Sequence, residues 1–214
     1  MKPKPPPSLD LAVMPDHDLE SEGVYRRLGF FDTDLSGRVA ESVDFSQCRF
    51  KGADLSGVNL GRAEVTDCLF EKSNLANLRA GRSSLIRTRL SILRMTGFTW
   101  LDGVVRDVTF EECRLDLSGW RFTDFRSVIF TKCNLSKADF TGADLTGAQF
   151  IGCDLTRAQF SNAKMSGTRF DDCTLLDVGG VTSWEGAVLR NQDLVALSYT
   201  LAAALGIRID DDSE

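Results

Sequence analysis

Residues 138–160 read ADFTGADLTGAQFIGCDLTRAQF, and the large apolar side chains of this stretch recur at every fifth position. They are Phe140, Leu145, Phe150, Leu155 and Phe160. A helix returns to the same face after about 3.6 residues and a strand after about two, so a period of five keeps neither element facing one core. The chain must therefore turn once in each unit, and a fixed internal period of this kind is typical of a repeat architecture.

The period extends through most of the chain. Every fifth residue from Tyr25 to Leu175 is apolar, which gives 31 consecutive centres without a slip of register. The position two before each centre is usually small, so each unit supplies one large and one small inward side chain. Eight glycines stand two residues after a centre, where we expect sharp corners that need permissive backbone. These are Gly37, Gly52, Gly57, Gly97, Gly142, Gly147, Gly152 and Gly167.

The pattern resembles the pentapeptide-repeat family, whose consensus is A(D/N)LXX. The stretches that carry the resemblance are GADLSGVNL at 52–60, CNLSKADFTGADLTGAQF at 133–150 and CDLTRAQF at 153–160. The resemblance implies an all-β fold, a right-handed quadrilateral β-helix with four pentapeptides in each coil. We therefore expect seven to eight coils over residues 25–178, which makes a rod about 35 Å long at an inter-strand spacing of about 4.8 Å.

A period of twenty within the sequence supports four faces per coil. Splitting the centres into four columns gives one column that is almost entirely Phe and a neighbouring column that is almost entirely Leu. The predicted core ladder consists of Phe50, Phe70, Phe110, Phe130, Phe150 and Phe170, beside Leu55, Leu75, Leu115, Leu135 and Leu155. All six cysteines occupy the small inward position. Cys48 and Cys68 lie on one face, and Cys113, Cys133, Cys153 and Cys173 lie on a neighbouring face, at intervals of twenty within each group. We interpret them as buried apolar side chains that fill the core.

Both ends differ from the repeat. Residues 1–24 begin with the proline-rich MKPKPPPSLD and are expected to form a flexible tail and a cap. Residues 179–214 are expected to form a C-terminal module with one short α-helix, which begins at an Asn191 or Asp193 N-cap and stops at Gly206. The helix either only caps the open edge of the stack or also forms a dimer, and the apolar pattern leaves both open.

The C-terminal segment from Asp193 to Ile209 is similar to the dimerisation module of the quinolone-resistance branch of the family, the Qnr and MfpA type. This resemblance implies a homodimer formed through Leu194, Leu197, Leu201, Leu205 and Ile207. In that branch the rod resembles B-form DNA, occupies the DNA-binding site of DNA gyrase or topoisomerase IV, and protects the enzyme from quinolones or inhibits it. The resemblance therefore implies a type II topoisomerase as the partner.

The charge pattern gives this interpretation partial support. The net charge of the chain is −6, and residues 134–214 alone carry 12 acidic and 6 basic residues. The predicted partner-binding acidic face consists of Asp44, Glu64, Asp124 and Asp144, which precede their centres in one column. Other positions of the column interrupt this face, so charges that merely solvate the rod are an equal alternative.

A basic segment departs from the acidic pattern. Five arginines lie between Arg79 and Arg94, with no acid between Glu71 and Asp102. We expect these arginines to pair with acids on adjacent coils. Direct binding to nucleic acid is not predicted, because the chain is acidic overall and no surface aromatics interleave with the arginines.

No enzymatic motif emerges from the sequence. The single histidine, His17, precedes the repeat, so a Ser-His or Cys-His pair cannot be built on the rod. We predict that the protein is not an enzyme and has no cofactor or metal. No apolar run is long enough to cross a membrane and no signal peptide is apparent, so we expect a cytoplasmic protein.

Three functional classes remain open. The first, implied by the resemblance, is a DNA-mimicking binder of DNA gyrase that protects it from quinolone-like poisons or modulates its response to them. The second is a structural or scaffolding rod that binds another protein. The third is direct sequestration of a toxic small molecule.

Overall fold

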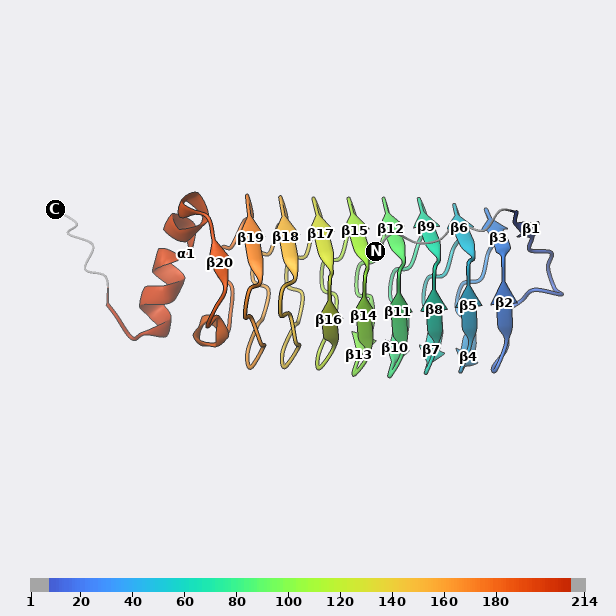
Figure 1. Ribbon diagram of the computed structural model, residues 1–214, viewed down its shortest axis with the longest axis horizontal. Coiled ribbons are helices and arrows are strands. Elements are labelled where there is room, and N and C mark those ends of the chain that lie inside the picture. The colour runs from blue at the N-terminus through green and yellow to red at the C-terminus, as the bar shows by residue number, and fades with distance from the viewer. Residues whose placement is uncertain (1–7, 209–214) are drawn as a thin grey trace.

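The computed structural model describes residues 8–208, which form a straight, rod-shaped parallel β-solenoid (Figure 1). Strands pair with strands twenty residues away, so that Phe30 lies beside Phe50 and Phe50 beside Phe70. Four pentapeptides therefore make one coil, and their centres form four columns along the rod. We call the four sides face 1 to face 4 in chain order, with Phe30, Leu35, Ala40 and Phe45 as their respective first centres.

Three of the faces contain β-sheets. Face 1 contains β1 (Asp10–Leu11), β3 (Leu28–Phe31), β6 (Arg49–Lys51), β9 (Leu69–Glu71), β12 (Arg89–Ser91), β15 (Thr109–Glu111), β17 (Ile129–Thr131), β18 (Gln149–Ile151), β19 (Arg169–Asp171) and β20 (Val188–Leu189). Face 3 contains β4 (Val39–Glu41), β7 (Asn59–Gly61), β10 (Arg79–Gly81) and β13 (Thr99–Leu101). Face 4 contains β2 (Val24–Arg26), β5 (Asp44–Ser46), β8 (Glu64–Thr66), β11 (Ser84–Ile86), β14 (Val104–Arg106) and β16 (Asp124–Arg126). Face 2 is held together by isolated bridges that run from Asp34 to Thr174.

Every corner of the rod has left-handed backbone. All 31 residues that follow a centre by two positions, from Arg27 to Asp177, have φ between 45° and 73°. The eight glycines predicted at corners are among them, and the other 23 corners are occupied by residues with side chains. The coil geometry thus imposes this conformation whatever the residue, although side chains other than Asn and Asp adopt it with difficulty.

The acidic residue of the repeat consensus has a local structural role. At seven positions an Asp or Asn side chain just before a centre accepts a hydrogen bond, of 2.8–3.2 Å, from the backbone N–H two residues later. Such Asx turns bend the chain toward the next corner. These residues are Asp34, Asp54, Asn74, Asn134, Asp139, Asp144 and Asp154. Several outward acids therefore shape the coil itself.

Stacked phenylalanines fill the axis of the rod. Ring centroids are 4.4 Å apart for Phe50 and Phe70 and 4.7 Å apart for Phe110 and Phe130, with parallel planes. Leu90 interrupts this ladder, and an apolar cavity of about 30 Å³ lies in the core beside it. All eleven residues of the predicted core ladder are buried.

The solenoid is longer than the sequence predicts. Nine strands, from β3 to β20, are stacked on face 1, against an expected seven to eight coils. The last layer follows the end of the five-residue register, and it consists of the short 3-10 helix η1 (Val181–Ser183) and β20. Trp184 stacks on Phe170 at 4.7 Å and continues the aromatic ladder. An aromatic outside the register thus closes the core.

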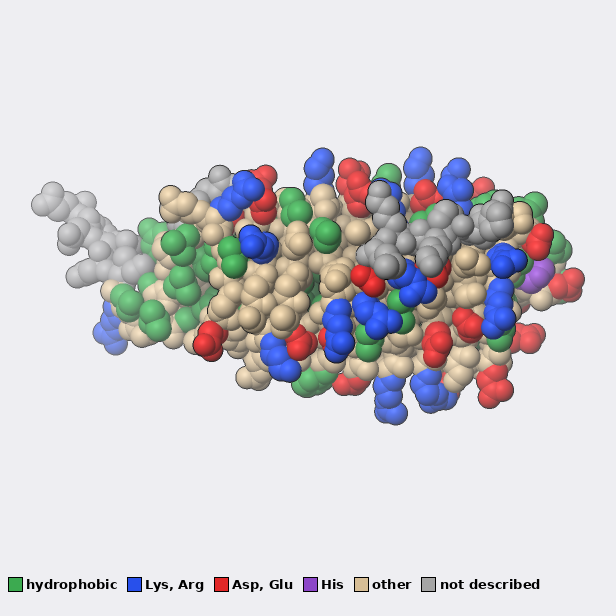
Figure 2. Space-filling view, in the orientation of Figure 1, with side chains coloured by type: hydrophobic (Ala, Val, Ile, Leu, Met, Phe, Trp, Pro, Cys, Tyr) green, Lys and Arg blue, Asp and Glu red, His purple; other side chains and the backbone are tan. Residues whose placement is uncertain are grey.

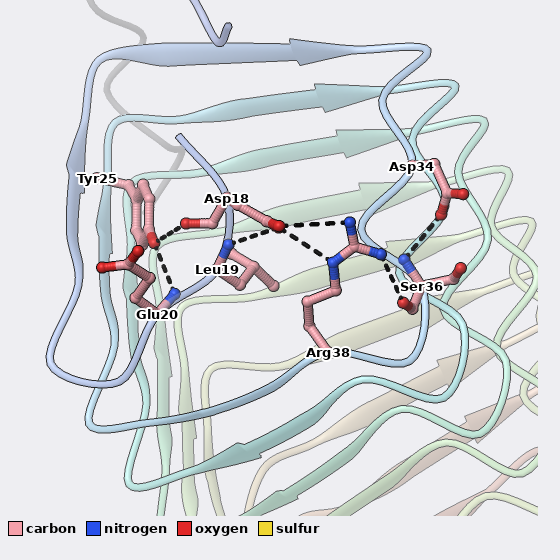
Figure 3. Close-up of polar contacts among 7 residues, drawn as sticks. All are labelled: Asp18, Leu19, Glu20, Tyr25, Asp34, Ser36 and Arg38. Carbon is pink, nitrogen blue, oxygen red and sulfur yellow. Dashed lines mark hydrogen bonds and ion pairs between the residues drawn. The ribbon is translucent and has the colours of Figure 1, made fainter. Parts of the chain in front are cut away.

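The N-terminal segment from residue 8 caps the first coil (Figure 3). The carboxylate of Asp18 binds the Arg38 guanidinium, with Oδ1 3.1 Å from Nε. Arg38 stands at a position that is small in most other coils. Because it lies in the first coil, at the open end of the rod, its side chain can reach the cap. The Tyr25 hydroxyl donates to the Asp18 carbonyl and accepts from the Glu20 N–H. The predicted tail at residues 1–7 lies outside the described residues.

Helix α1 (Asn191–Ala204) lies at the other end of the rod (Figure 1). Its N-cap is Arg190 and not Asn191 or Asp193, because both of those residues already belong to the first helical turn. Gly206 ends the helix as predicted, with φ 72°. The N–H groups of Gly206 and Ile207 donate to carbonyls of the last turn, at 3.1 and 2.9 Å, in the arrangement of a Schellman motif.

Candidate functional site

The interior of the rod offers little room for a ligand. The cavity of about 30 Å³ has an apolar lining, whereas sites for small molecules usually have about 300–1,000 Å³. All six cysteines are buried and free, and burial raises the pKa of the Cys68 thiol well above its usual range. No group of three potential metal ligands occurs among residues 8–208.

The single histidine belongs to the N-terminal cap. His17 Nδ1 accepts a hydrogen bond of 3.0 Å from the N–H of Val13, within its own turn. No helix in the described part of the chain is long and apolar enough to cross a membrane. The outer surface of the rod and its two ends are therefore the places to look for a functional site.

The residues of the predicted acidic face form one straight column on face 4. Asp44 pairs in register with Glu64, and Asp124 lies beside Asp144 farther along the rod. Most of this charge is compensated. Arg26 lies 3.7 Å from Asp44, Arg126 2.8 Å from Asp124 and Lys164 3.4 Å from Asp144. Glu64 has no ion pair among the described residues.

The hydrogen bonds of Asp144 keep it ionised. Burial is the largest single influence and raises the pKa of this carboxyl, but hydrogen bonds from Thr146 and Lys164 outweigh it and lower the pKa. The Asp144 carboxylate thus accepts hydrogen bonds within its own turn and from Lys164 of the next coil. The four acids share one column, and cations paired with three of them offset most of its negative charge.

Charge pairing is a general property of the rod. Eleven ion pairs connect described residues, and most of them join adjacent coils. The least exposed pair is Asp67 with Arg87, whose two hydrogen bonds measure 2.8 and 2.9 Å. The hydrogen bond to Asp67 raises the pKa of Arg87. Figure 2 shows acidic and basic side chains interspersed over the visible side of the rod.

The basic segment follows the expected pairing only in part. Arg87 pairs with Asp67, and Arg89 pairs with Glu111. Arg79, Arg82 and Arg94 have no ion pair within residues 8–208. Arg94 lies on face 2, Arg79 on face 3, and Arg82 at the corner between faces 3 and 4.

The structure divides the predicted dimerisation residues into two groups. Leu197 is 1% exposed and packs in the core, and Leu201 is partly buried against it. Leu194, Leu205 and Ile207 are 45%, 73% and 56% exposed. Tyr199, which is not among the five predicted dimerisation residues, is 68% exposed. One side of α1 therefore caps the rod, and apolar side chains elsewhere on the helix and its end remain uncovered (Figure 2). Ile209 lies outside the described residues.

One further feature escaped the sequence reasoning. Three of the 31 corner residues are apolar, and they are Ile92, Leu117 and Phe122. All three are more than half exposed. The five-residue period predicts that these three residues stand at outward corners. An apolar residue two positions after a centre is therefore the signal in the sequence that identifies them.

Comparison with known families identifies the repeat. The model for pentapeptide repeats matches with eight copies, at residues 30–67, 106–147, 121–157 and 138–175, which together span just over half of the chain. The chain belongs to the pentapeptide-repeat family. A search of curated proteins finds no match.

Solved pentapeptide-repeat proteins share the fold at low sequence identity. Full-length QnrB1, a plasmid-mediated fluoroquinolone resistance protein, is 20% identical, with 84% of this chain and 99% of that chain covered and a TM-score of 0.44. HetL, involved in heterocyst differentiation regulation in the cyanobacterium Nostoc sp. strain PCC 7120, is 14% identical, with coverages of 82% and 93% and a TM-score of 0.31. At these values the likeness says nothing of what this pentapeptide-repeat protein binds.

Proposed function

We propose that this pentapeptide-repeat protein is a DNA-mimicking rod that binds a type II topoisomerase, DNA gyrase or topoisomerase IV, in the place of DNA. By occupying that site it changes the response of the enzyme to quinolone-like poisons. The observation that carries the proposal is the uncovered apolar surface of α1 at the acidic end of the rod. Its exposed apolar residues are Leu194, Tyr199, Leu205 and Ile207, which together we call the α1 surface.

Two chains that join through the α1 surface would bring their acidic ends together. Residues 134–214 carry 12 acidic and 6 basic residues, a net charge of −6 for each chain and −12 for two chains, and four of these acids lie at 210–214, outside the described residues. Proteins that bind DNA use cationic surfaces that attract phosphates, and an elongated anionic partner is complementary to them. We therefore assign the mimicry to the centre of the dimer first.

The column on face 4 has a secondary place in the proposal. Cations offset Asp44, Asp124 and Asp144, and only Glu64 is without an ion pair among the described residues. An offset column contributes little to a long-range field, because the dipole of an ion pair weakens faster with distance than a net charge. Contacts at this column would need its ion pairs to rearrange.

The proposal is tested by adding the purified protein to DNA gyrase in supercoiling and quinolone-induced cleavage assays. We expect less cleaved complex, or recovered supercoiling, when the protein is near the concentration of the enzyme. The effect should weaken as salt increases, because exposed charges are screened. A Tyr199→Asp variant changes the α1 surface at an exposed position, so its effect on the cleaved complex should be weaker than that of the wild type. If the wild type has no effect on either gyrase or topoisomerase IV, the proposal is wrong.

A scaffolding rod is the second candidate, and the pairing of charges along the coils favours it. A rod with compensated faces suits a protein partner that buries surface without a large salt dependence. Binding that persists at high salt, with no effect on either topoisomerase, would support this candidate. The core cavity of about 30 Å³ is too small for a drug, so sequestration of a toxic small molecule, the third candidate, would have to use an outer groove or the dimer centre.

A further inference from the structure

Three apolar residues stand at corners that other coils fill with glycine or polar residues. Ile92, Leu117 and Phe122 have φ of 55°, 60° and 57°. Their exposed fractions are 51%, 56% and 58%. The remaining 28 corners contain glycine, charged or polar residues. All three exceptions fall within 31 consecutive residues in the middle of the rod, near β13 and β15 (Figure 1).

These residues are unfavourable for the fold. A bulky side chain in the left-handed region is an outlier, and a β-branched residue such as Ile92 is the most strained case. Exposure means that most of the apolar surface of each side chain gains nothing from burial. The Phe122 ring lies against Gly142, where an added Cβ would approach within 2.6 Å of the ring, but the ring remains mostly exposed. Local strain of this kind is often retained at functional sites.

The three side chains frame faces 2 and 3. Leu117 and Phe122 stand at the two corners of one side on face 3, and Ile92 stands at the opposite corner of face 2, one coil earlier. On face 2, Arg94 and Arg114 are register partners in adjacent coils. Neither guanidinium has an ion pair in the described part of the chain, although like charges this close repel each other.

No carboxylate among residues 8–208 forms an ion pair with Arg94 or Arg114. Asp116 on face 2 accepts a hydrogen bond of 2.9 Å from the Thr96 hydroxyl. Across residues 79–122, faces 2 and 3 and the corners that bound them have five outward arginines and three acids. The arginines are Arg79, Arg82, Arg94, Arg114 and Arg121, and the acids are Asp102, Glu112 and Asp116. Only Arg121 among these arginines has an ion pair, with Asp139 at 3.6 Å. The surface therefore combines exposed apolar corners with two stacked arginines, Arg94 and Arg114, that have no ion pair among residues 8–208.

We propose that Ile92, Leu117, Phe122, Arg94 and Arg114 form a docking surface, the corner patch, for a partner protein segment with carboxylates beside apolar side chains. Aromatic residues and arginines are enriched at the energetic centres of protein interfaces. The carboxylates of such a segment would pair with Arg94 and Arg114, while its apolar side chains cover the corners. A nucleic acid would satisfy the arginines but not the three apolar side chains, and the net charge of −6 opposes its approach. The corner patch is independent of the α1 surface and of the topoisomerase proposal.

The test measures affinity and stability together. The probe is a fluorescein-labelled synthetic peptide in which Asp and Glu flank Leu and Phe, and its binding is followed by fluorescence anisotropy. The variant is Leu117→Asn with Phe122→Asn, because asparagine accepts the left-handed conformation. We expect the affinity to fall about tenfold or more, while the midpoint of thermal unfolding stays the same or rises. Lys137→Asn, at the same corner one coil later, is the matched control and should leave the affinity unchanged.

Other outcomes would overturn the proposal. A double variant that binds the peptide as well as the wild type shows that the corners do not contact it. A large loss of thermal stability shows that the apolar corners serve the fold. If the wild type binds a peptide with Ser in place of Leu and Phe as tightly as the original peptide, the surface recognises only the carboxylates. Tighter wild-type binding to a short DNA duplex assigns the surface to nucleic acid.

Discussion

Replacing Leu90 with phenylalanine should stabilise the rod. Leu90 is the one break in a column of phenylalanines that otherwise runs from Phe30 to Phe170. Stacks on both sides of the break are regular, with centroids 4.4 Å apart below it and 4.7 Å apart above it. The cavity of about 30 Å³ lies beside Leu90. A Leu90→Phe ring would occupy this space and lie between Phe70 and Phe110.

The expected gain follows from the cavity and from the new ring contacts. Eliminating about 30 Å³ of cavity, at roughly 24 cal/mol for each Å³, is worth about 0.7 kcal/mol. Two new aromatic pairs contribute about 0.5–1.5 kcal/mol each, and crowding against the bulky Leu93 and Trp100 offsets part of this. We expect a net stabilisation of about 1 kcal/mol, which for a chain of this size raises the melting temperature by roughly 2–4 °C.

Urea unfolding followed by circular dichroism measures the change. The midpoint should rise while the slope m stays constant. Leu135→Phe is the matched control, because Leu135 is fully buried and does not line the cavity. This control should lose about 1–3 kcal/mol through overpacking. A Leu90→Phe variant that is less stable than the wild type, or no different from the Leu135→Phe variant, would refute the reasoning.

Three further predictions concern an inward glycine, the N-terminal cap and the α1 surface. Gly103→Ala should lose roughly 1–3 kcal/mol in thermal unfolding, because its Cβ would lie 2.6 Å from a carbonyl oxygen and an indole nitrogen; Gly81→Ala, whose nearest neighbour is 4.0 Å away, is the control. The hydrogen bond from Arg38 lowers the pKa of Asp18, so its stabilisation is complete above the unfolded pKa of about 3.9 and is lost as pH falls through the lower folded pKa. Pepsin should therefore cleave the cap faster as pH falls through that range, and Asp18→Asn should remove this dependence. Tyr199→Asp should halve the mass in light scattering, and an unchanged mass would exclude the α1 surface as a dimer interface.

The coils can be predicted from the sequence because each pentapeptide forms the same local structure, with a buried centre and a left-handed corner. The side chain of Phe50 meets that of Phe70 through a period that can be counted without knowing any distant contact. The corners follow from the same period, and so does the position of Gly142. The last layer could not be predicted this way, because Trp184 enters the core from outside the register and its place depends on tertiary packing.

Charge compensation along the rod is visible in the sequence. Asp144 and Lys164 are twenty residues apart and Asp67 and Arg87 are also twenty apart, so the period already places them on adjacent coils. A count of acids in one column omits these neighbours. The buried side of α1 could not be predicted from the sequence. Apolar residues surround much of this helix, so the pattern does not indicate that Leu197 packs against the rod.

The central claim is that the rod occupies the DNA-binding site of a type II topoisomerase, and displacement of DNA tests it most directly. A fluorescein-labelled DNA duplex bound to gyrase is titrated with the purified protein, and the anisotropy of the duplex is recorded at low and high salt. We expect the duplex to be released as the protein binds, with a weaker effect at high salt and a weaker effect for Tyr199→Asp. Duplex that stays bound at saturating protein would contradict it.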